Sequence, residues 1–192
     1  MKGKLIIFSA PSGSGKTTIV KHLLQQNLGL EFSISATSRA ARHTETHGKD
    51  YYFLSPEEFK NKVDADEFLE WEEVYQGTCY GTLKAEVERI RNQGKHVLFD
   101  VDVVGGVNIK KYYADEALAV FVQPPSVEEL ERRLNGRGTD SAEVIQKRID
   151  KAEYELSFAS KFDYVLINDQ LEVALQEAEE VIEKFVGNSK GF

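Results

Sequence analysis

A glycine-rich turn between a short apolar segment and an amphipathic one constrains this chain more than any other feature. Residues 4–9 (KLIIFS) are a short apolar run, typical of a strand buried in a sheet. From about Lys16 to Gln26, apolar residues recur at helical spacing. Further apolar runs follow at 95–101, 117–122 and 163–167, and helical patterns are expected at about 82–92, 126–134, 141–159 and 171–186. Strands that alternate with helices predict an α/β fold, with a mostly parallel sheet and helices on both faces.

The turn itself is SAPSGSGKT, Ser9 to Thr17. Glycines let backbone N–H groups converge on anionic oxygens, and the following helix adds the partial positive charge of its N-terminus. Lys16 can reach the β- and γ-phosphates of a nucleoside triphosphate, and the Thr17 hydroxyl can ligate Mg²⁺. Strand, turn and helix in this order predict a P-loop, although Ala10 stands where the general pattern has glycine. The alternative is a Gly/Ser-rich turn with an incidental lysine. The residues expected at the triphosphate are Ala10, Pro11, Ser12, Gly13, Ser14, Gly15, Lys16, Thr17 and Thr18.

An acidic residue closes the second buried strand, which we place at 95–101. Asp100 lies where a Mg²⁺-linked carboxylate is expected beside a P-loop. Its alternative role is to cap a turn. With the P-loop present the metal role is favoured, so Thr17 and Asp100 are the predicted Mg²⁺ ligands, partly through water.

Composition excludes several functional classes. Lys and Arg number 24 and Asp and Glu 32, which gives a net charge of −8, so a generally basic nucleic-acid binder is not expected. The single cysteine, Cys79, cannot form an internal disulfide, which fits a reducing compartment. We see no apolar run of membrane-spanning length and no signal peptide. The expectation is a cytoplasmic protein with neither a nucleic-acid nor a membrane partner.

Other short motifs accompany the turn. In order they are SAPSGSGKTT, SISATSRAAR, GKDYYF, FLEW, YGT, FDVD, RRLNGRGT and IND. Their joint order and spacing closely resemble the guanylate kinases, over Leu5 to about Phe185. The resemblance implies the Mg²⁺-dependent reaction ATP + GMP ⇌ ADP + GDP, with dGMP as a further acceptor, in purine nucleotide metabolism and GMP recycling. It also implies one domain, 1–192, with a P-loop core (about 1–32, 83–125 and 160–186), an inserted GMP-binding lobe (about 33–82) and a helical lid (about 126–159).

The residues that the resemblance assigns to GMP have suitable chemistry. Arg39 and Arg42 can grip a phosphate in forked fashion, with Tyr51 and Tyr80 as additional donors. Glu70 can accept from guanine N1–H and the 2-amino group, which adenine does not offer in the same pattern. Taken singly, Glu70 could instead be a surface charge beside Trp71, and Tyr51 and Tyr80 could serve sheet packing. The full predicted GMP set is Ser35, Arg39, Arg42, Tyr51, Glu70, Tyr80, Thr82 and Asp102.

The lid is expected to bring positive charge to the transferred phosphoryl group, because positioning and charge neutralisation dominate such reactions. Its alternative is a solvated charged face, since acidic residues are interspersed. Asn168 matches a position expected near the ATP adenine. The predicted catalytic residues are Lys16, Arg39, Arg133, Arg137 and Arg148.

Two rival functions stay open at this point. One is a kinase for another nucleoside monophosphate, which Glu70 and Asp102 argue against. The other is a scaffold module that binds phosphorylated peptides in the monophosphate site, although such modules generally have degraded P-loops. The chain also departs from the family, with Ala41 in place of proline and Val104 in place of glutamine. No phosphate or metal ligand is lost, and the expected partners are the nucleotides alone, with no obligate protein partner.

Overall fold

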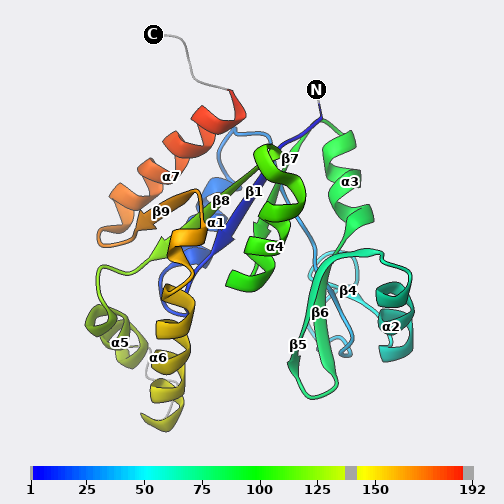
Figure 1. Ribbon diagram of the computed structural model, residues 1–192, viewed down its shortest axis with the longest axis horizontal. Helices are drawn as coiled ribbons and strands as arrows, with labels where there is room; N and C mark the ends of the chain where they lie inside the picture. Colours follow the sequence, from blue (N-terminus) through cyan, green and yellow to red (C-terminus); the bar gives the residue numbers. More distant parts are fainter. Residues whose placement is uncertain (1, 137–141, 188–192) are drawn as a thin grey trace. The chain divides into compact units, whose positions relative to one another are not determined.

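The computed structural model describes residues 2–136 and 142–187 (Figure 1). The chain divides into two compact units, residues 5–30 with 98–192 and residues 1–4 with 31–97. Two sheets are present among the described residues: a five-stranded one in the order β2-β7-β1-β8-β9, and a four-stranded one in the order β4-β3-β6-β5. The predicted division into core, lobe and lid stays a prediction.

The larger sheet is built on buried apolar strands. It comprises β1 (Leu5–Ser9), β8 (Ala117–Gln123), β9 (Tyr164–Ile167), β7 (His96–Asp100) and β2 (Leu30–Phe32). Strand β8 pairs in parallel with β1 on one side and with β9 on the other. Every residue of β1 is buried, as expected of a central parallel strand covered on both faces. The predicted parallel α/β sheet is confirmed.

Helices lie on both faces of this sheet, with α4 in front of it and α1 behind it in Figure 1. The elements of this unit are α1 (Lys16–Leu23), α4 (Val103–Tyr113), α5 (Val127–Gly136), α6 (Ala142–Leu156), α7 (Leu171–Val186) and the short 3₁₀ helices η1 (Ala114–Glu116) and η2 (Ala159–Lys161). Helices α5 and α6 share an apolar cluster that includes Leu130, Leu134 and Ile149.

Helix α4 was not predicted, because its two glycines and its valines do not favour a helix locally. The structure explains one of those glycines. A Cβ on Gly106 would lie 2.6 Å from Ser9 Oγ and 3.3 Å from the Phe162 ring. The close approach of α4 to the end of β1 therefore requires glycine there. Tertiary packing has overridden local propensity.

The other unit holds the smaller sheet. It comprises β3 (Ala36–Thr37), β4 (Tyr52–Phe53), β5 (Phe68–Tyr75) and β6 (Thr78–Leu83), with helices α2 (Pro56–Asp64) and α3 (Lys84–Asn92). Strands β5 and β6 form an antiparallel hairpin, whereas β3 and β4 are parallel. In the sequence, Ser55 followed by Pro56 predicts a helix start, and the structure confirms it with a capping box between Ser55 and Glu58. Residues 32–35 (FSIS) predict a short strand by sequence, and these bounds are wrong, since residues 33–35 lie in no strand.

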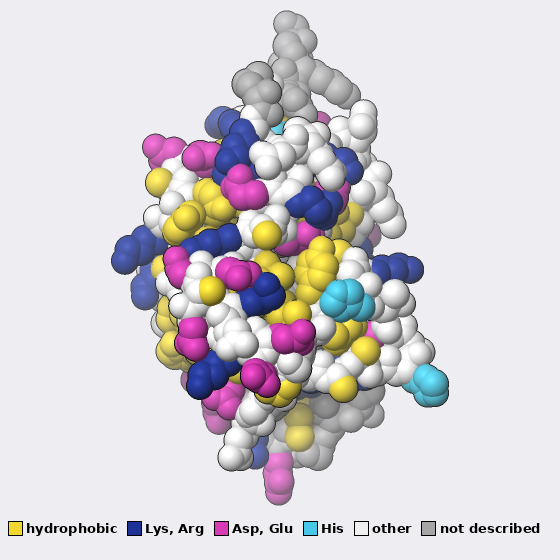
Figure 2. Space-filling model, turned by 90° about the vertical axis from the view of Figure 1, so that its right-hand side faces the viewer, with side chains coloured by type: hydrophobic (Ala, Val, Ile, Leu, Met, Phe, Trp, Pro, Cys, Tyr) yellow, Lys and Arg dark blue, Asp and Glu magenta, His cyan; other side chains and the backbone are white. Residues whose placement is uncertain are grey.

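Charges are mixed over the surface on the α2 and α3 side, where Figure 2 shows basic and acidic side chains interleaved. No single-sign patch of the kind that tracks a nucleic-acid backbone is visible on this face. In the described ranges, no helix has the length and apolar character needed to cross a membrane.

Candidate active site

The turn after β1 is held in one conformation by its own backbone. The N–H of Ser14 donates to the Pro11 carbonyl at 3.1 Å. At the start of α1, the N–H groups of Thr18 and Ile19 both donate hydrogen bonds to the Gly15 carbonyl. Gly15 has φ 91°, in the left-handed region that glycine adopts at little cost. A Cβ on Gly15 would lie 2.2 Å from the Asn168 amide nitrogen, so this glycine is also required for space.

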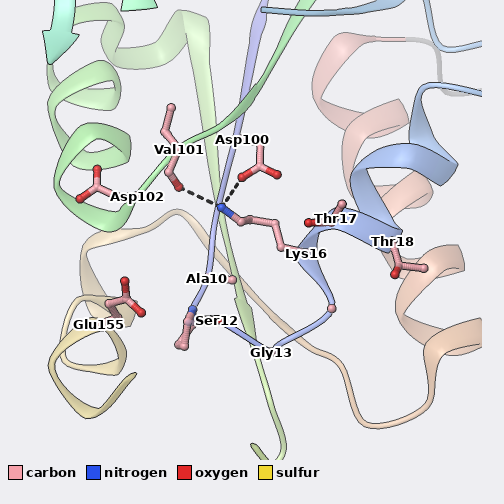
Figure 3. Close-up of a pocket in the computed structure, with 12 residues that line it drawn as sticks. Ala10, Ser12, Gly13, Lys16, Thr17, Thr18, Asp100, Val101, Asp102 and Glu155 are labelled. Carbon is pink, nitrogen blue, oxygen red and sulfur yellow. Dashed lines mark hydrogen bonds and ion pairs between the residues drawn. The ribbon is translucent and has the colours of Figure 1, made fainter. Parts of the chain in front are cut away.

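A cavity of about 390 Å³ opens over this turn (Figure 3). It is lined by nearly all of the residues predicted at the triphosphate, and by both of the predicted metal ligands. The lining residues are Ala10, Pro11, Ser12, Gly13, Gly15, Lys16, Thr17, Thr18, Asp100, Val101, Asp102 and Glu155. Ser14 does not line it, because that residue is fully buried beneath the loop.

Lys16 points across the cavity toward the end of β7 (Figure 3). Its Nζ forms a close ion pair with Asp100 and donates to the Val101 carbonyl at 3.2 Å. Both side chains of the pair are partly exposed to the cavity. The predicted phosphate ligand and the predicted metal-linked carboxylate are thus direct neighbours.

Asp102 and Asn168 have structural partners that sequence reasoning did not anticipate. Asp102 is the N-cap of α4, where its carboxylate accepts the N–H of Gly105 at 2.7 Å. Asn168 is buried, and its Nδ2 donates to the Ser14 carbonyl at 2.8 Å. Asn168 therefore supports the phosphate-binding turn, and its expected place near adenine stays a prediction.

Two of the predicted lid arginines are described. Arg148, on α6, approaches the turn, with Nη1 3.5 Å from Ser12 Oγ. Arg133, on α5, donates to Glu129 at 2.8 Å and to the Asp169 carbonyl at 3.4 Å. Hydrogen bonds from Arg132 and then Arg133 lower the pKa of Glu129 to about 2. The third predicted lid arginine, Arg137, lies outside the described residues.

The smaller unit gathers the other predicted arginines and tyrosines. Arg39 Nε donates to the Tyr80 hydroxyl at 3.0 Å, and its guanidinium lies 5.1 Å from the centre of the Tyr51 ring. The two tyrosine rings meet edge to face at 5.7 Å. Arg42 is exposed on the adjoining loop, three residues before Glu45. These side chains form one cluster of donors around a guanidinium.

The predicted base-recognition pair lies on the β5–β6 hairpin. Glu70 stands opposite Thr82 in the antiparallel register, and the Thr82 hydroxyl donates to Glu70 Oε1 at 2.6 Å. Thr82 is buried and Glu70 partly so. Ser35 belongs to the same unit, where its carbonyl accepts the N–H of Tyr52 at 2.9 Å.

Two acidic residues near these sites were missed. Glu155 lines the cavity and is 6% exposed, and burial raises the pKa of its carboxyl group. Its spacing of seven from Arg148 places the two residues on one helix face, which was a usable signal. Glu45 pairs with Arg39 in the other unit. Hydrogen bonds from the Arg39 side chain and the Arg42 N–H lower the pKa of Glu45 to about 2.

The cavity, the glycine turn and the parallel sheet define a P-loop protein of the nucleotide-binding α/β class. Comparisons with known proteins narrow this class. The family model "Guanylate kinase" matches residues 2–185. The guanylate kinase of Bacteroides thetaiotaomicron is 62% identical over 186 residues, which cover 97% of this chain and 91% of that protein. The guanylate kinase of Porphyromonas gingivalis is 56% identical, over 95% of this chain and 98% of that protein.

Solved structures agree with the sequence matches. The crystal structure of guanylate kinase from Anaplasma phagocytophilum superimposes with a TM-score of 0.74 at 29% identity, covering 96% of this chain and 87% of that one. The chain belongs to the guanylate kinase family.

Proposed function

We propose that this chain transfers the γ-phosphoryl group of ATP to GMP, giving ADP and GDP, through the residues described above. The activity of an ATP:GMP phosphotransferase follows from its membership of the guanylate kinase family. The observation that carries the proposal is the cavity over an intact P-loop, lined by Lys16, Thr17 and Asp100. Because the reaction draws on nucleotide pools, we place the protein in the cytoplasm.

The turn receives the phosphate chain of ATP. The backbone N–H groups of Gly13, Gly15 and Lys16 bind the anionic oxygens, and the N-terminus of α1 adds its partial positive charge. Lys16 exchanges its ion pair with Asp100 for the β- and γ-phosphates. The positive charge of Lys16 has an anionic partner before and after the exchange, so the exchange leaves no unpaired charge in the cavity.

The cavity has the donor set that Mg²⁺ prefers. The Thr17 hydroxyl and the Asp100 carboxylate are hard oxygen donors that line the same cavity. When bound, Mg²⁺ neutralises charge on the phosphate oxygens. Once Lys16 holds the phosphates, the Asp100 carboxylate would be free of its ion pair and would be a ligand for Mg²⁺. Among the described residues, no three His, Cys, Asp or Glu side chains are close enough to form a metal centre of their own.

The smaller unit receives GMP. Arg39, Arg42 and the hydroxyls of Tyr51 and Tyr80 supply donors for its phosphate. Glu70, oriented by the Thr82 hydroxyl, accepts from guanine N1–H and the 2-amino group. Adenine offers neither donor, so a partly buried carboxylate oxygen of Glu70 would lose its partner and the wrong base is disfavoured. Ser35 is a further proposed base contact in this unit, and the role expected for Asp102 at the base stays a prediction.

The protein's part in the transfer is positional and electrostatic, since phosphoryl transfer needs little covalent work from the enzyme. Lys16, Arg39, Arg133, Arg137 and Arg148 supply the positive charge. The contact of Arg148 with Ser12 supports this role, because it brings a lid guanidinium to the turn.

An acceptor panel tests the function. Purified protein with ATP and Mg²⁺ is given GMP, dGMP, AMP or UMP, and ADP release is followed by a coupled assay. We expect ADP with GMP and dGMP only. Equal rates with AMP and GMP would refute the guanine assignment. If the protein binds GMP but releases no ADP when GMP is added, a binding module would be favoured.

A further inference from the structure

Glu45 lies within the cluster of donors in the smaller unit, which comprises Arg39, Arg42, Tyr51 and Tyr80. Arg39 Nη1 and Nη2 each donate to one of its carboxylate oxygens, at 2.6 and 2.7 Å. The backbone N–H of Arg42 donates to the same carboxylate at 2.8 Å, and the Glu45 N–H returns a bond to the Arg42 carbonyl at 3.0 Å. One side chain therefore ties together both of the arginines proposed to hold the GMP phosphate.

The Arg39 guanidinium is almost fully engaged. Besides Glu45, it donates to the Tyr80 hydroxyl at 3.0 Å and to the Ala40 carbonyl at 3.0 Å, and it lies over the Tyr51 ring. Four of its five N–H donors are thus used, and the fifth, on Nη2, has no acceptor among residues 2–136 and 142–187. The forked grip on phosphate predicted for Arg39 is incompatible with an intact Arg39–Glu45 pair.

Two outcomes are possible when a phosphate arrives. Glu45 can be displaced, which makes it a competitor of the phosphate, or it can stay in place and hold Arg39. Displacement would break both bonds to Arg39 and the bond from the Arg42 N–H, which closes the turn carrying Arg42. Charge-assisted bidentate bonds are among the strongest that a protein makes. The geometry therefore favours retention.

We propose that Glu45 is a positioning residue for the GMP phosphate, which stays bound to Arg39 and keeps both arginines arranged to receive it. The phosphate then binds the remaining Nη2 donor of Arg39, the Arg42 side chain and the tyrosine hydroxyls. Because the donors are ordered beforehand, less conformational entropy is lost on binding. This inference rests on the GMP site proposed above.

The test compares GMP with guanosine, which lacks the phosphate. Dissociation constants for both are measured by calorimetry on the wild-type protein and on Glu45→Gln, with thermal unfolding as a check of the fold. We expect Glu45→Gln to weaken GMP binding about tenfold, since a bidentate ionic pair is lost, while guanosine binding changes by less than about twofold. Glu67→Gln is the matched control, because Glu67 pairs with Lys62 on the surface of the same unit; neither constant should change.

Every other result overturns the inference. Tighter GMP binding in Glu45→Gln would show that Glu45 competes with the phosphate. Equal losses for GMP and guanosine would show that it only stabilises the unit. If Glu45→Gln does not fold, Glu45→Asp, which keeps the charge on a shorter side chain, must show the selective loss for GMP. Failure of the wild-type protein to bind GMP would refute the proposed function itself. If the wild-type protein binds GMP and the ratio of the GMP and guanosine dissociation constants is the same in Glu45→Gln, this inference alone is refuted.

Discussion

Replacing Asn168 by alanine removes the side-chain bond that supports the phosphate-binding turn from below. Asn168 follows β9, is 5% exposed and donates Nδ2 to the Ser14 carbonyl at 2.8 Å. Its own N–H is fixed on the Gln123 carbonyl at 2.8 Å, so the residue is positioned by the sheet. In Asn168→Ala, the buried Ser14 carbonyl loses this donor.

The expected magnitude follows from that unpaired carbonyl. A buried polar group left without its partner costs about 1–3 kcal/mol. In a domain of this size, each kcal/mol lowers the melting temperature by about 2–4 °C, so the total is roughly 2–12 °C. If the cost falls on the conformation of the turn that binds phosphates, ATP affinity drops by about 5- to 150-fold. GMP affinity should not change, because the proposed GMP residues other than Asp102 lie in the other unit.

The assay combines calorimetric melting with titration of a non-hydrolysable ATP analogue and of GMP. Asn168→Asp sharpens it, since a carboxylate oxygen then faces the Ser14 carbonyl oxygen and the loss should exceed that of alanine. Asn92→Ala, which removes an exposed amide at the end of α3, is the control. The reasoning is refuted if Asn168→Ala binds the ATP analogue within twofold of wild type and melts within 2 °C of it, or if Asn168→Asp behaves as wild type.

Three further predictions concern other sites. Lys16→Ala should lower kcat by about 10²–10³-fold, because a preorganised cation is lost, with little change in the urea midpoint; near wild-type kcat would contradict its role. Glu70→Gln should lower kcat/KM for GMP by at least about tenfold and reduce selectivity over AMP, and unchanged selectivity in steady-state assays would argue against a base contact. Burial, with a smaller effect of the Lys4 charge, lowers the pKa of His96 from 6.5, and its Nδ1 accepts the Lys4 N–H at 2.9 Å. The unfolded chain therefore binds a proton at His96 more readily, so stability falls as pH drops below about 6.5. Between pH 7.5 and 5.5, urea unfolding should show a smaller loss of unfolding free energy in His96→Asn than in the wild type. Equal losses in the two proteins would contradict this prediction.

Elements with a strong local signal were predictable. The final helix was expected at 171–186 and is observed at Leu171–Val186, because its apolar residues recur at helical spacing without interruption. The start of α2 followed from a serine cap with proline at the first helical position. The P-loop followed in the same way from glycines and a lysine between strand and helix. In each case the deciding contacts are local in sequence.

Contacts between distant residues decided the rest. Helix α4 forms despite poor propensity because it packs on β1 and β8, with Gly106 against Ser9. Asn168 reaches Ser14 across 154 positions, and Lys16 meets Asp100 across 84, so neither pair leaves a mark in a local pattern.

The amino-acid sequence alone therefore determined the class of fold, the phosphate-binding turn and the residue types available to hold two nucleotides. The tertiary structure decided which charges meet: Asp100 with Lys16, and Glu45 with Arg39. Ion pairs depend on distance and burial after folding, whereas turns and helices depend on neighbours along the chain. For that reason the sequence indicated where phosphate can bind, and only the folded chain revealed the carboxylates that hold those cations in place.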